Sequence, residues 1–239
     1  MSISEQAFWN FYARLYDTLG TTIPYTQLHR EIVGCLKHIH NDQARVLDAG
    51  CGTGHQLKLI RDRHPSWRLS GLDRSEAMLQ VASRKLRDDN VVLQQGDLSK
   101  PLPFNDETFD AVISTNVLYT LPDPVAHLRE LRRILKKGGT LVLVNPWNPK
   151  PHLVPIAHYQ RIIQRKRPEE ILSTIVHTPS YVTIFALNLL IAAKAKNQTY
   201  TFTPAHAFSA TLESCGFKIH TARQDIYANT CVLFQAKAV

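Results

Sequence analysis

A glycine-rich loop after the first apolar run is where this chain is best suited to bind a ligand. Residues 46–54 read VLDAGCGTG, with Gly50, Gly52 and Gly54 at alternate positions. Glycine lets the backbone turn sharply and lets a ligand lie close, which a Cβ would prevent. Asp73 ends the next apolar run, about twenty residues on, where a carboxylate can accept hydrogen bonds from both hydroxyls of a ribose. The pattern predicts a nucleotide site at the carboxyl end of the first strand.

Dinucleotide-binding folds use a similar strand, loop and acid, so they are the competing interpretation. Their fingerprint is GxGxxG, whereas this loop reads GxGxG. The start of the following helix is therefore not shaped in the usual way for a pyrophosphate. The spacing disfavours NAD as the ligand.

Short apolar runs alternate with longer helical patterns between residues 45 and 146, which is typical of βαβ units on a parallel sheet. We expect strands at 45–48, 67–73, 91–95, 109–114 and 140–145. The helix before the last of these is the clearest, because Asp123 can cap it, Pro124 suits its first turn and Gly138 can end it.

This alternation breaks in residues 147–200, where we expect three helices, at 153–166, 168–176 and 180–196, and no strand. A helix from 203 to 215 and two runs, 218–226 and 230–237, then suggest an antiparallel pair at the sheet edge. The predicted fold is α/β: a doubly wound, mostly parallel seven-stranded sheet of Rossmann-like type, with an antiparallel last strand and an inserted helical cap.

Five motifs in order extend the pattern beyond the glycine loop. They are DAGCGTG from Asp48, GLDRSEAMLQVA from Gly71, QGDL from Gln95, FDAVISTNVLYTLPD from Phe109 and LRRILKKGGTLVLV from Leu131. Over residues 10–145 they resemble the successive motifs of class I S-adenosylmethionine-dependent methyltransferases, especially the small-molecule group that includes the ubiquinone and menaquinone enzymes. The resemblance is specific for cofactor and fold and nearly silent on substrate.

The resemblance implies a cofactor site for S-adenosyl-L-methionine. The residues implied at its methionine end and at the start of the next helix are Asp48, Gly50, Gly52 and Gly54. Those implied at its ribose and adenine are Asp73, Arg74, Met78, Asp97 and Leu98. Asn116 would reach the methionine portion, and Tyr16 would close over it. The alternative for Asp73 and Asp97 is an ordinary role in a turn or a helix cap. The alternative for Met78 and Leu98 is packing in the core.

The predicted organisation follows from these motifs. An N-terminal helical cap would occupy residues 1–40, and the S-adenosylmethionine-binding Rossmann-like core residues 41–146. A helical substrate cap would occupy residues 147–200, and the end of the core sheet residues 201–239.

No constellation of residues identifies a catalytic base. Methyl transfer from a sulfonium is an in-line displacement, so the protein mainly aligns the acceptor and excludes water. An oxygen acceptor would need a base, an amine only an unprotonated nitrogen, and a carbon acceptor an activated ring. The candidates are His55 in the glycine loop, Tyr119 after the fourth strand, and His152 and His158 in the cap, with His152 first because it opens the inserted segment. A structural role is the alternative for each.

The formal charge of +8 lies mostly in the carboxyl-terminal part, since residues 146–239 carry 10 basic and 4 acidic side chains. This bias can mark an acidic substrate, a lipid surface or nucleic acid, or serve solubility alone. Ser114-Thr115-Asn116-Val117 stands where nucleic-acid amine methyltransferases often carry an NPPY-like run, which makes nucleic acid unlikely as the substrate. The four scattered cysteines predict free thiols and no metal site.

The first residues show no secretory pattern. The apolar run 184–193 has about half the length that spans a bilayer. We therefore expect a soluble, cytoplasmic protein.

Apolar and aromatic residues of the cap and of the amino terminus could form a roof over a hydrophobic acceptor. They are Tyr181, Phe185, Leu189, Leu190, Phe8, Trp9, Phe11 and Tyr12. The alternative is that they only seal helices onto the sheet. The leading hypothesis is S-adenosylmethionine-dependent methyl transfer to oxygen, nitrogen or carbon of a small, hydrophobic or aromatic metabolite, such as a natural product or a quinone precursor. The alternatives are a lipid-surface methyltransferase in peripheral contact with a membrane, and a regulatory protein that binds the cofactor without turnover.

Overall fold

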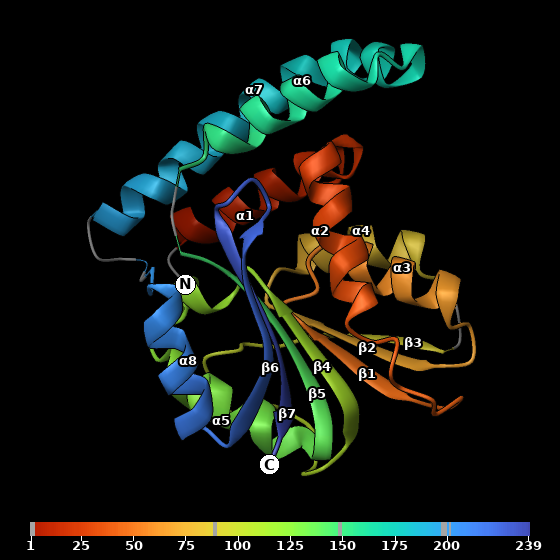
Figure 1. Cartoon of the computed structure of the whole chain (residues 1–239), viewed down its shortest axis with the longest axis vertical. Helices are drawn as coiled ribbons and strands as arrows, with labels where there is room; N and C mark the ends of the chain where they lie inside the picture. Colours follow the sequence, from red (N-terminus) through yellow and green to blue (C-terminus); the bar gives the residue numbers. More distant parts are fainter. Residues whose placement is uncertain (1–2, 88–89, 148–149, 197–199, 201) are drawn as a thin grey trace.

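Seven strands form one sheet in a computed structural model that describes residues 3–87, 90–147, 150–196, 200 and 202–239. The strands are β1 (Arg45–Ala49), β2 (Arg68–Asp73), β3 (Val91–Gln95), β4 (Phe109–Thr115), β5 (Leu135–Pro146), β6 (Phe217–Ile226) and β7 (Cys231–Ala238). Their order is β3-β2-β1-β4-β5-β7-β6, and β7 runs antiparallel to both of its neighbours (Figure 1). The predicted fold class and the antiparallel pair at the sheet edge are confirmed.

Helices cover both faces of the sheet (Figure 1). One face carries α2 (Ile23–Gly34), α3 (His55–Arg63) and α4 (Glu76–Lys85), and the other carries α5 (Pro124–Ile134) and α8 (Ala205–Ser214). Side chains alternate along β5, so that Leu141 and Leu143 pack with α5 and α8 while Val142 and Val144 pack with α2 and α3. Central strands covered on both faces are apolar on both, which explains the short continuous apolar runs in the sequence.

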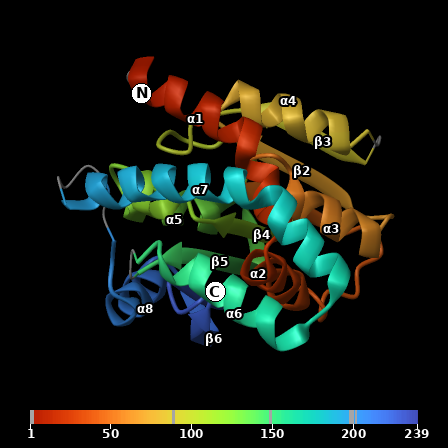
Figure 2. The ribbon, with the colours of Figure 1, turned by 90° about the horizontal axis from the view of Figure 1, so that it is seen from above.

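A helical layer lies over the carboxyl ends of the parallel strands. It consists of α1 (Ile3–Tyr16), η1 (Asp17–Thr21), α6 (Leu153–Arg165) and α7 (Pro168–Lys196). In the view from above, α6 and α7 extend across the molecule (Figure 2). Tyr12 Oη of α1 donates to Asn188 Oδ1 of α7 at 2.9 Å, and Thr21 Oγ1 lies 2.6 Å from Tyr181 Oη. These hydrogen bonds join the inserted segment to the amino-terminal helices.

The inserted segment corrects one prediction. Residues 168–176 and 180–196 belong to a single helix, α7, with Pro179 inside it. A proline lacks the N–H that a helix interior needs and commonly ends or bends the helix, and α7 changes direction part-way along its length (Figure 2). Hydrogen bonds on either side of the proline, between Thr174 and His158 and between Tyr181 and Thr21, tie both halves to the rest of the protein.

The helix α7 is longer than either of the two helices that were predicted in its place. Pro168–Ala193 is long and apolar enough to cross a membrane by length and composition, with a mean hydropathy of 1.5, and 11% of its most apolar stretch is buried. The apolar run 184–193 noted in the sequence is only the carboxyl-terminal part of this stretch. The cytoplasmic location stays a prediction.

The helix before β5 shows a second difference. Asp123 caps it as predicted, since its side chain accepts from Ala126 N at 2.9 Å. The helix ends at Ile134, however, and not at Gly138, because Leu135 already pairs with Phe109 of β4. The predicted division into residues 1–40, 41–146, 147–200 and 201–239 stays a prediction.

Candidate functional site

The glycine loop between β1 and α3 is held by backbone hydrogen bonds and by close packing. The N–H of Gly50 donates to Leu72 O of β2 at 2.7 Å, and Gly50, Gly52 and Gly54 have φ values of +89°, +51° and +72°. A Cβ on Gly50 would overlap Val117, whereas a Cβ on Gly52 would meet no atom within 4 Å. The loop therefore needs glycine for its backbone, and at Gly52 it borders open space that a ligand can fill.

Asp73, at the end of β2, faces the same loop. Its carboxylate accepts from Gly52 N and from Ser75 N, both at 2.8 Å. Burial raises the pKa of Asp73, and these backbone N–H groups act in the opposite direction. Each carboxylate oxygen has a second lone pair, so the group can still accept hydrogen bonds from a ligand.

Asp48, at the end of β1, is 3% exposed. Burial and, secondarily, the neighbouring Asp73 raise the pKa of Asp48 to about 7. It lines a small cavity of about 30 Å³ together with Tyr16, His29 and His55. Tyr16 also lines the main cavity, as do Gly50 and Gly52, so the two cavities adjoin.

The predicted adenine end of the site lies between β2, β3 and the residues after them. Met78 and Leu98 are buried and line the main cavity with Arg74 and Asp97. Asp97 accepts from the backbone N and the Oγ of Ser99, at 3.0 and 2.7 Å. Burial alone would raise the pKa of Asp97, but these hydrogen bonds lower it. The carboxylate is therefore an ionised acceptor at neutral pH.

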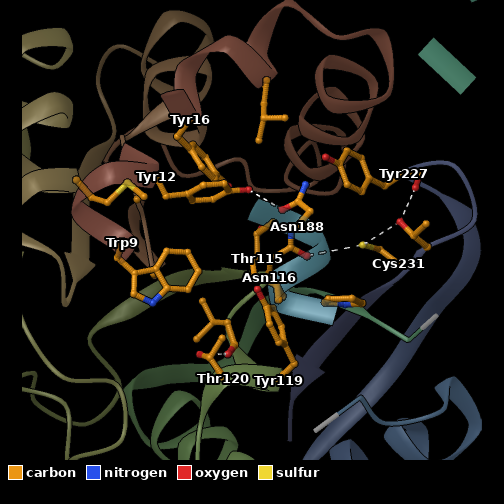
Figure 3. A pocket seen from close by; sticks show the side chains of 18 of the residues that line it. Trp9, Tyr12, Tyr16, Thr115, Asn116, Tyr119, Thr120, Asn188, Tyr227 and Cys231 are labelled. Carbon is orange, nitrogen blue, oxygen red and sulfur yellow. Dashed lines mark hydrogen bonds between the residues drawn. The ribbon is translucent and has the colours of Figure 1, made fainter. Parts of the chain in front are cut away.

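The main cavity has a volume of about 260 Å³ and continues from this end to an aromatic end. Its aromatic end is built from α1, η2 (Leu118–Thr120), α7 and the segments around them. In Figure 3 the side chains of Trp9, Tyr12, Tyr119 and Asn188 surround a common space. The residues there that were not predicted to belong to the site include Thr115, Thr120, Asn188, Phe202, Tyr227 and Cys231.

Two of these residues stand at positions in the sequence that could have been assigned to the site. Asn188 is a lone amide within the apolar run 184–193, and Thr115 directly precedes Asn116. Tyr227 and Cys231 come from the far end of the chain and reach the cavity only because β7 inserts beside β5. No local pattern marks them.

The end of β4 brings two polar side chains to the cavity. Asn116 has a φ of +58° and accepts from Cys231 Sγ at 3.7 Å (Figure 3). The hydroxyl of Thr115 is buried and has no hydrogen-bond partner in the part of the chain that the structure describes, although Thr115 lines both cavities. A buried, unpaired hydroxyl facing a cavity is available to a ligand.

The four candidate bases lie in different places. His55 is half-buried and lines the small cavity, where burial lowers its pKa. His152 is exposed and lies outside the lining of both cavities. His158 is buried, with Nδ1 accepting from Ile23 N at 3.3 Å and Nε2 lying 3.2 Å from Thr174 Oγ1, so it links α2, α6 and α7. Only Tyr119 lines the main cavity, and burial raises its pKa well above 10.

The predicted roof is made only in part by the residues named for it. Trp9 and Tyr12 line the main cavity, but Leu189 and Leu190 are 46% and 55% exposed and lie outside its lining. Their neighbours in α7 take that position, namely Asn188, Ile191 and Ala192. Among the described residues, no group of three or more histidine, cysteine, aspartate or glutamate side chains could hold a metal ion.

Comparison with known proteins shows a similarity over the part of the chain that contains the glycine loop. Residues 47–143 match the family model described as a methyltransferase domain. This match covers less than half of the chain and shows a similarity to methyltransferase domains over these residues. The demethylmenaquinone methyltransferase of Thermotoga maritima is 32% identical over 135 residues, which are 55% of this chain and 57% of that protein. A chloroplastic 2-methyl-6-phytyl-1,4-hydroquinone methyltransferase of Oryza sativa is 29% identical over 61% of this chain and 42% of its own length.

A solved structure shows the same fold over nearly the whole chain. The S-adenosylmethionine-dependent methyltransferase of Aquifex aeolicus has a TM-score of 0.57 and 18% identity, and the match covers 93% of each chain. This chain spans only about half of the length of the curated relatives named above. The matched residues contain the glycine loop, Asp73, Asp97 and Asn116, whereas α1, α6 and α7 lie outside them.

Proposed function

We propose that this chain binds S-adenosyl-L-methionine and transfers its methyl group to a small hydrophobic acceptor with an aromatic ring. One observation carries the proposal: a single cavity is lined at one end by Gly52, Asp73 and Asp97 and at the other by Trp9 and Tyr119. A donor held by the first group and an acceptor held by the second meet inside one cavity. Such an arrangement supplies what an in-line displacement needs, namely alignment and exclusion of water.

The cofactor residues fit this proposal by their chemistry. We assign the ribose hydroxyls to Asp73 and the adenine amino group to Asp97, with Met78 and Leu98 against the ring. The ammonium of the methionine portion would lie near Asp48, in the small cavity beside Gly50 and Gly52. Asn116, Tyr16 and the unpaired Thr115 hydroxyl complete the methionine end.

The acceptor end favours a carbon atom as the site of methylation. Burial raises the pKa of Tyr119 and Tyr227, and it raises that of Cys231 to about 12, so these side chains keep their own protons at neutral pH. An oxygen acceptor would need a base beside it, whereas an electron-rich hydroquinone ring is activated by its own hydroxyl groups. The sulfonium sulfur keeps the electron pair of the broken bond, the ring carbon gains the methyl group, and its proton leaves to solvent.

The acceptor class also agrees with the names of the relatives, which act on demethylmenaquinone and on a methylated phytyl hydroquinone. Asn188 and Tyr12 would orient a ring hydroxyl, because their hydrogen-bonded pair is the polar feature that α1 and α7 bring to the cavity. The exposed Lys150, which also lines the cavity, could balance the charge of an ionised hydroquinone.

The test combines binding with turnover. Calorimetry should detect S-adenosylhomocysteine binding by the wild-type chain, and Asp73→Ala should weaken it by tenfold or more. A panel of hydroquinones, phenols and amines is then incubated with S-adenosylmethionine, and products are identified by mass spectrometry and NMR. C-methylated hydroquinone is the expected product. Absence of cofactor binding would refute the proposal, methyl ethers or methylamines would refute the carbon acceptor, and binding without turnover of any compound would favour a regulatory protein.

A further inference from the structure

The helix α7 exposes an unusually large number of apolar side chains for a surface helix. Toward the protein it presents the buried Ile184 and Leu187 together with hydrogen-bonded polar side chains, namely those of Thr174, Tyr181 and Asn188. Its exposed large apolar residues are Ile171, Leu172, Ile175, Val176, Val182, Leu189 and Leu190, with exposed fractions from 39% to 65%. A surface helix of a protein in water normally turns its apolar stripe to the core. The outward side of α7 is therefore suited to an apolar neighbour.

The partner helix α6 continues this surface. It exposes Ile156, Tyr159 and Ile163, and Tyr159 Oη lies 3.3 Å from Thr178 Oγ1 of α7, so the two exposed sides adjoin. We call these ten apolar residues of α6 and α7 the outer face. The view from above shows both helices on the near side of the molecule (Figure 2).

The charges around the outer face are mostly basic, although Glu169 and Glu170 directly precede it. Residues 171–193 contain no Asp, Glu, Lys or Arg, and Arg165, Lys166 and Arg167 precede them while Lys194 and Lys196 follow in the sequence. Glu170 is shared by Arg165 and Arg167, at 3.1 and 3.7 Å. Residues 147–200 carry seven basic and two acidic side chains. An uncharged apolar stripe with basic residues at its ends complements an anionic lipid surface.

The same features argue against two other neighbours. Pairing of α7 with α7 of a second copy would bring basic ends together whether the helices ran parallel or antiparallel. A membrane-spanning α7 would have to give up its hydrogen bonds to Tyr12, Thr21 and His158 and expose the polar partners to hydrocarbon. A helix lying in the plane of the interface keeps these bonds.

We propose that the outer face docks onto an anionic lipid bilayer, with α7 lying in the membrane interface. The 26 residues of Pro168–Ala193 would extend over roughly 39 Å of that surface. Leu189 and Leu190 of the outer face adjoin Asn188 and Ile191 of the cavity lining, so docking brings the acceptor end of the cavity next to the bilayer. This inference goes beyond the proposed methyl transfer and does not depend on it, because docking requires no cofactor.

The test is flotation of the full chain with phosphatidylcholine vesicles that contain or lack phosphatidylglycerol. The wild-type chain should float with the anionic vesicles, and salt should weaken this binding. Ile175→Gln together with Val182→Gln should weaken it by roughly tenfold or more, since both side chains would otherwise be buried in lipid. The matched control is Val92→Gln with Val239→Gln, because these valines are 61% and 64% exposed and lie on the strand β3 and at the carboxyl terminus, outside the outer face. The control should float like the wild type.

Several outcomes would overturn the proposal. It fails if the wild-type chain does not float with anionic vesicles, or if the α7 double variant floats as well as the control. Resistance of the bound chain to extraction by alkaline carbonate would indicate a spanning helix in place of an interfacial one. A stable dimer in lipid-free solution that the α7 double variant abolishes would assign the outer face to a second copy. Circular dichroism of both double variants checks that each is folded.

Discussion

The buried carboxyl of Asp48 should make cofactor affinity depend on pH in a specific window. Burial and Asp73 raise its pKa to about 7 in the ligand-free protein, so about half of the molecules carry a neutral Asp48 at neutral pH. An ammonium bound beside it favours the carboxylate, so the bound ligand lowers this pKa and binding releases a proton. Affinity should therefore be highest at about pH 8, where the ligand keeps its ammonium, and fall as pH decreases through 7.

The size of the effect follows from linkage. One pKa unit corresponds to about 1.4 kcal/mol, so affinity should fall by up to about tenfold for each pH unit below 7, until the pKa of the bound state is reached. Between pH 8 and pH 6 this amounts to about a tenfold loss. Asp48→Asn cannot exchange this proton, so its weaker affinity should be independent of pH in the same window.

Calorimetric titration with S-adenosylhomocysteine measures both quantities. At pH 6.5 the apparent enthalpy should change with the ionisation enthalpy of the buffer, because a proton is released on binding. Asp97→Asn is the control: the pKa of Asp97 is lowered, so this variant should lose affinity yet keep the wild-type pH profile. A flat wild-type profile from pH 6 to 8 with no proton release would refute the placement of the ammonium at Asp48.

Three further predictions follow from individual contacts. Gly50→Ala should lower the free energy of unfolding by about 2 kcal/mol or more, because its Cβ would overlap Val117. The Cβ of Gly52→Ala meets no atom within 4 Å, so this variant should lower cofactor affinity more than stability. Chemical denaturation measures the stability and calorimetry the affinity. Asn188→Leu should raise KM for the acceptor several-fold and leave the dissociation constant of S-adenosylhomocysteine unchanged, in steady-state kinetics and calorimetry. His158→Leu should cost about 1–3 kcal/mol of stability by removing two buried hydrogen bonds, whereas the exposed His152→Leu should cost little, measured by urea unfolding.

The central sheet and the cofactor end of the site could be predicted because both depend on short segments. The strand before Asp48, the loop glycines and Asp73 lie within 30 residues, and parallel strands bring their carboxyl ends to one edge of the sheet. The residue at which a helix ends was harder to predict than the strands. The pattern at Gly138 predicts a stop, but the pairing of Leu135 with Phe109 starts the strand earlier, and no local signal reports that pairing.

The acceptor end could not be predicted in the same way, because it is assembled from residues far apart in sequence. Tyr12 meets Asn188 across 176 positions, and Cys231 meets Asn116 across 115. A rule that apolar side chains point inward assigns Leu189 and Leu190 to the cavity, yet in α7 the amide of Asn188 points inward and these leucines point outward. The rule assumes water on the outer side of a helix. It holds for the buried Ile184 and Leu187 but fails for Leu189 and Leu190, as expected if their side of α7 faces lipid, so the error in the predicted roof and the proposed bilayer contact have the same physical cause.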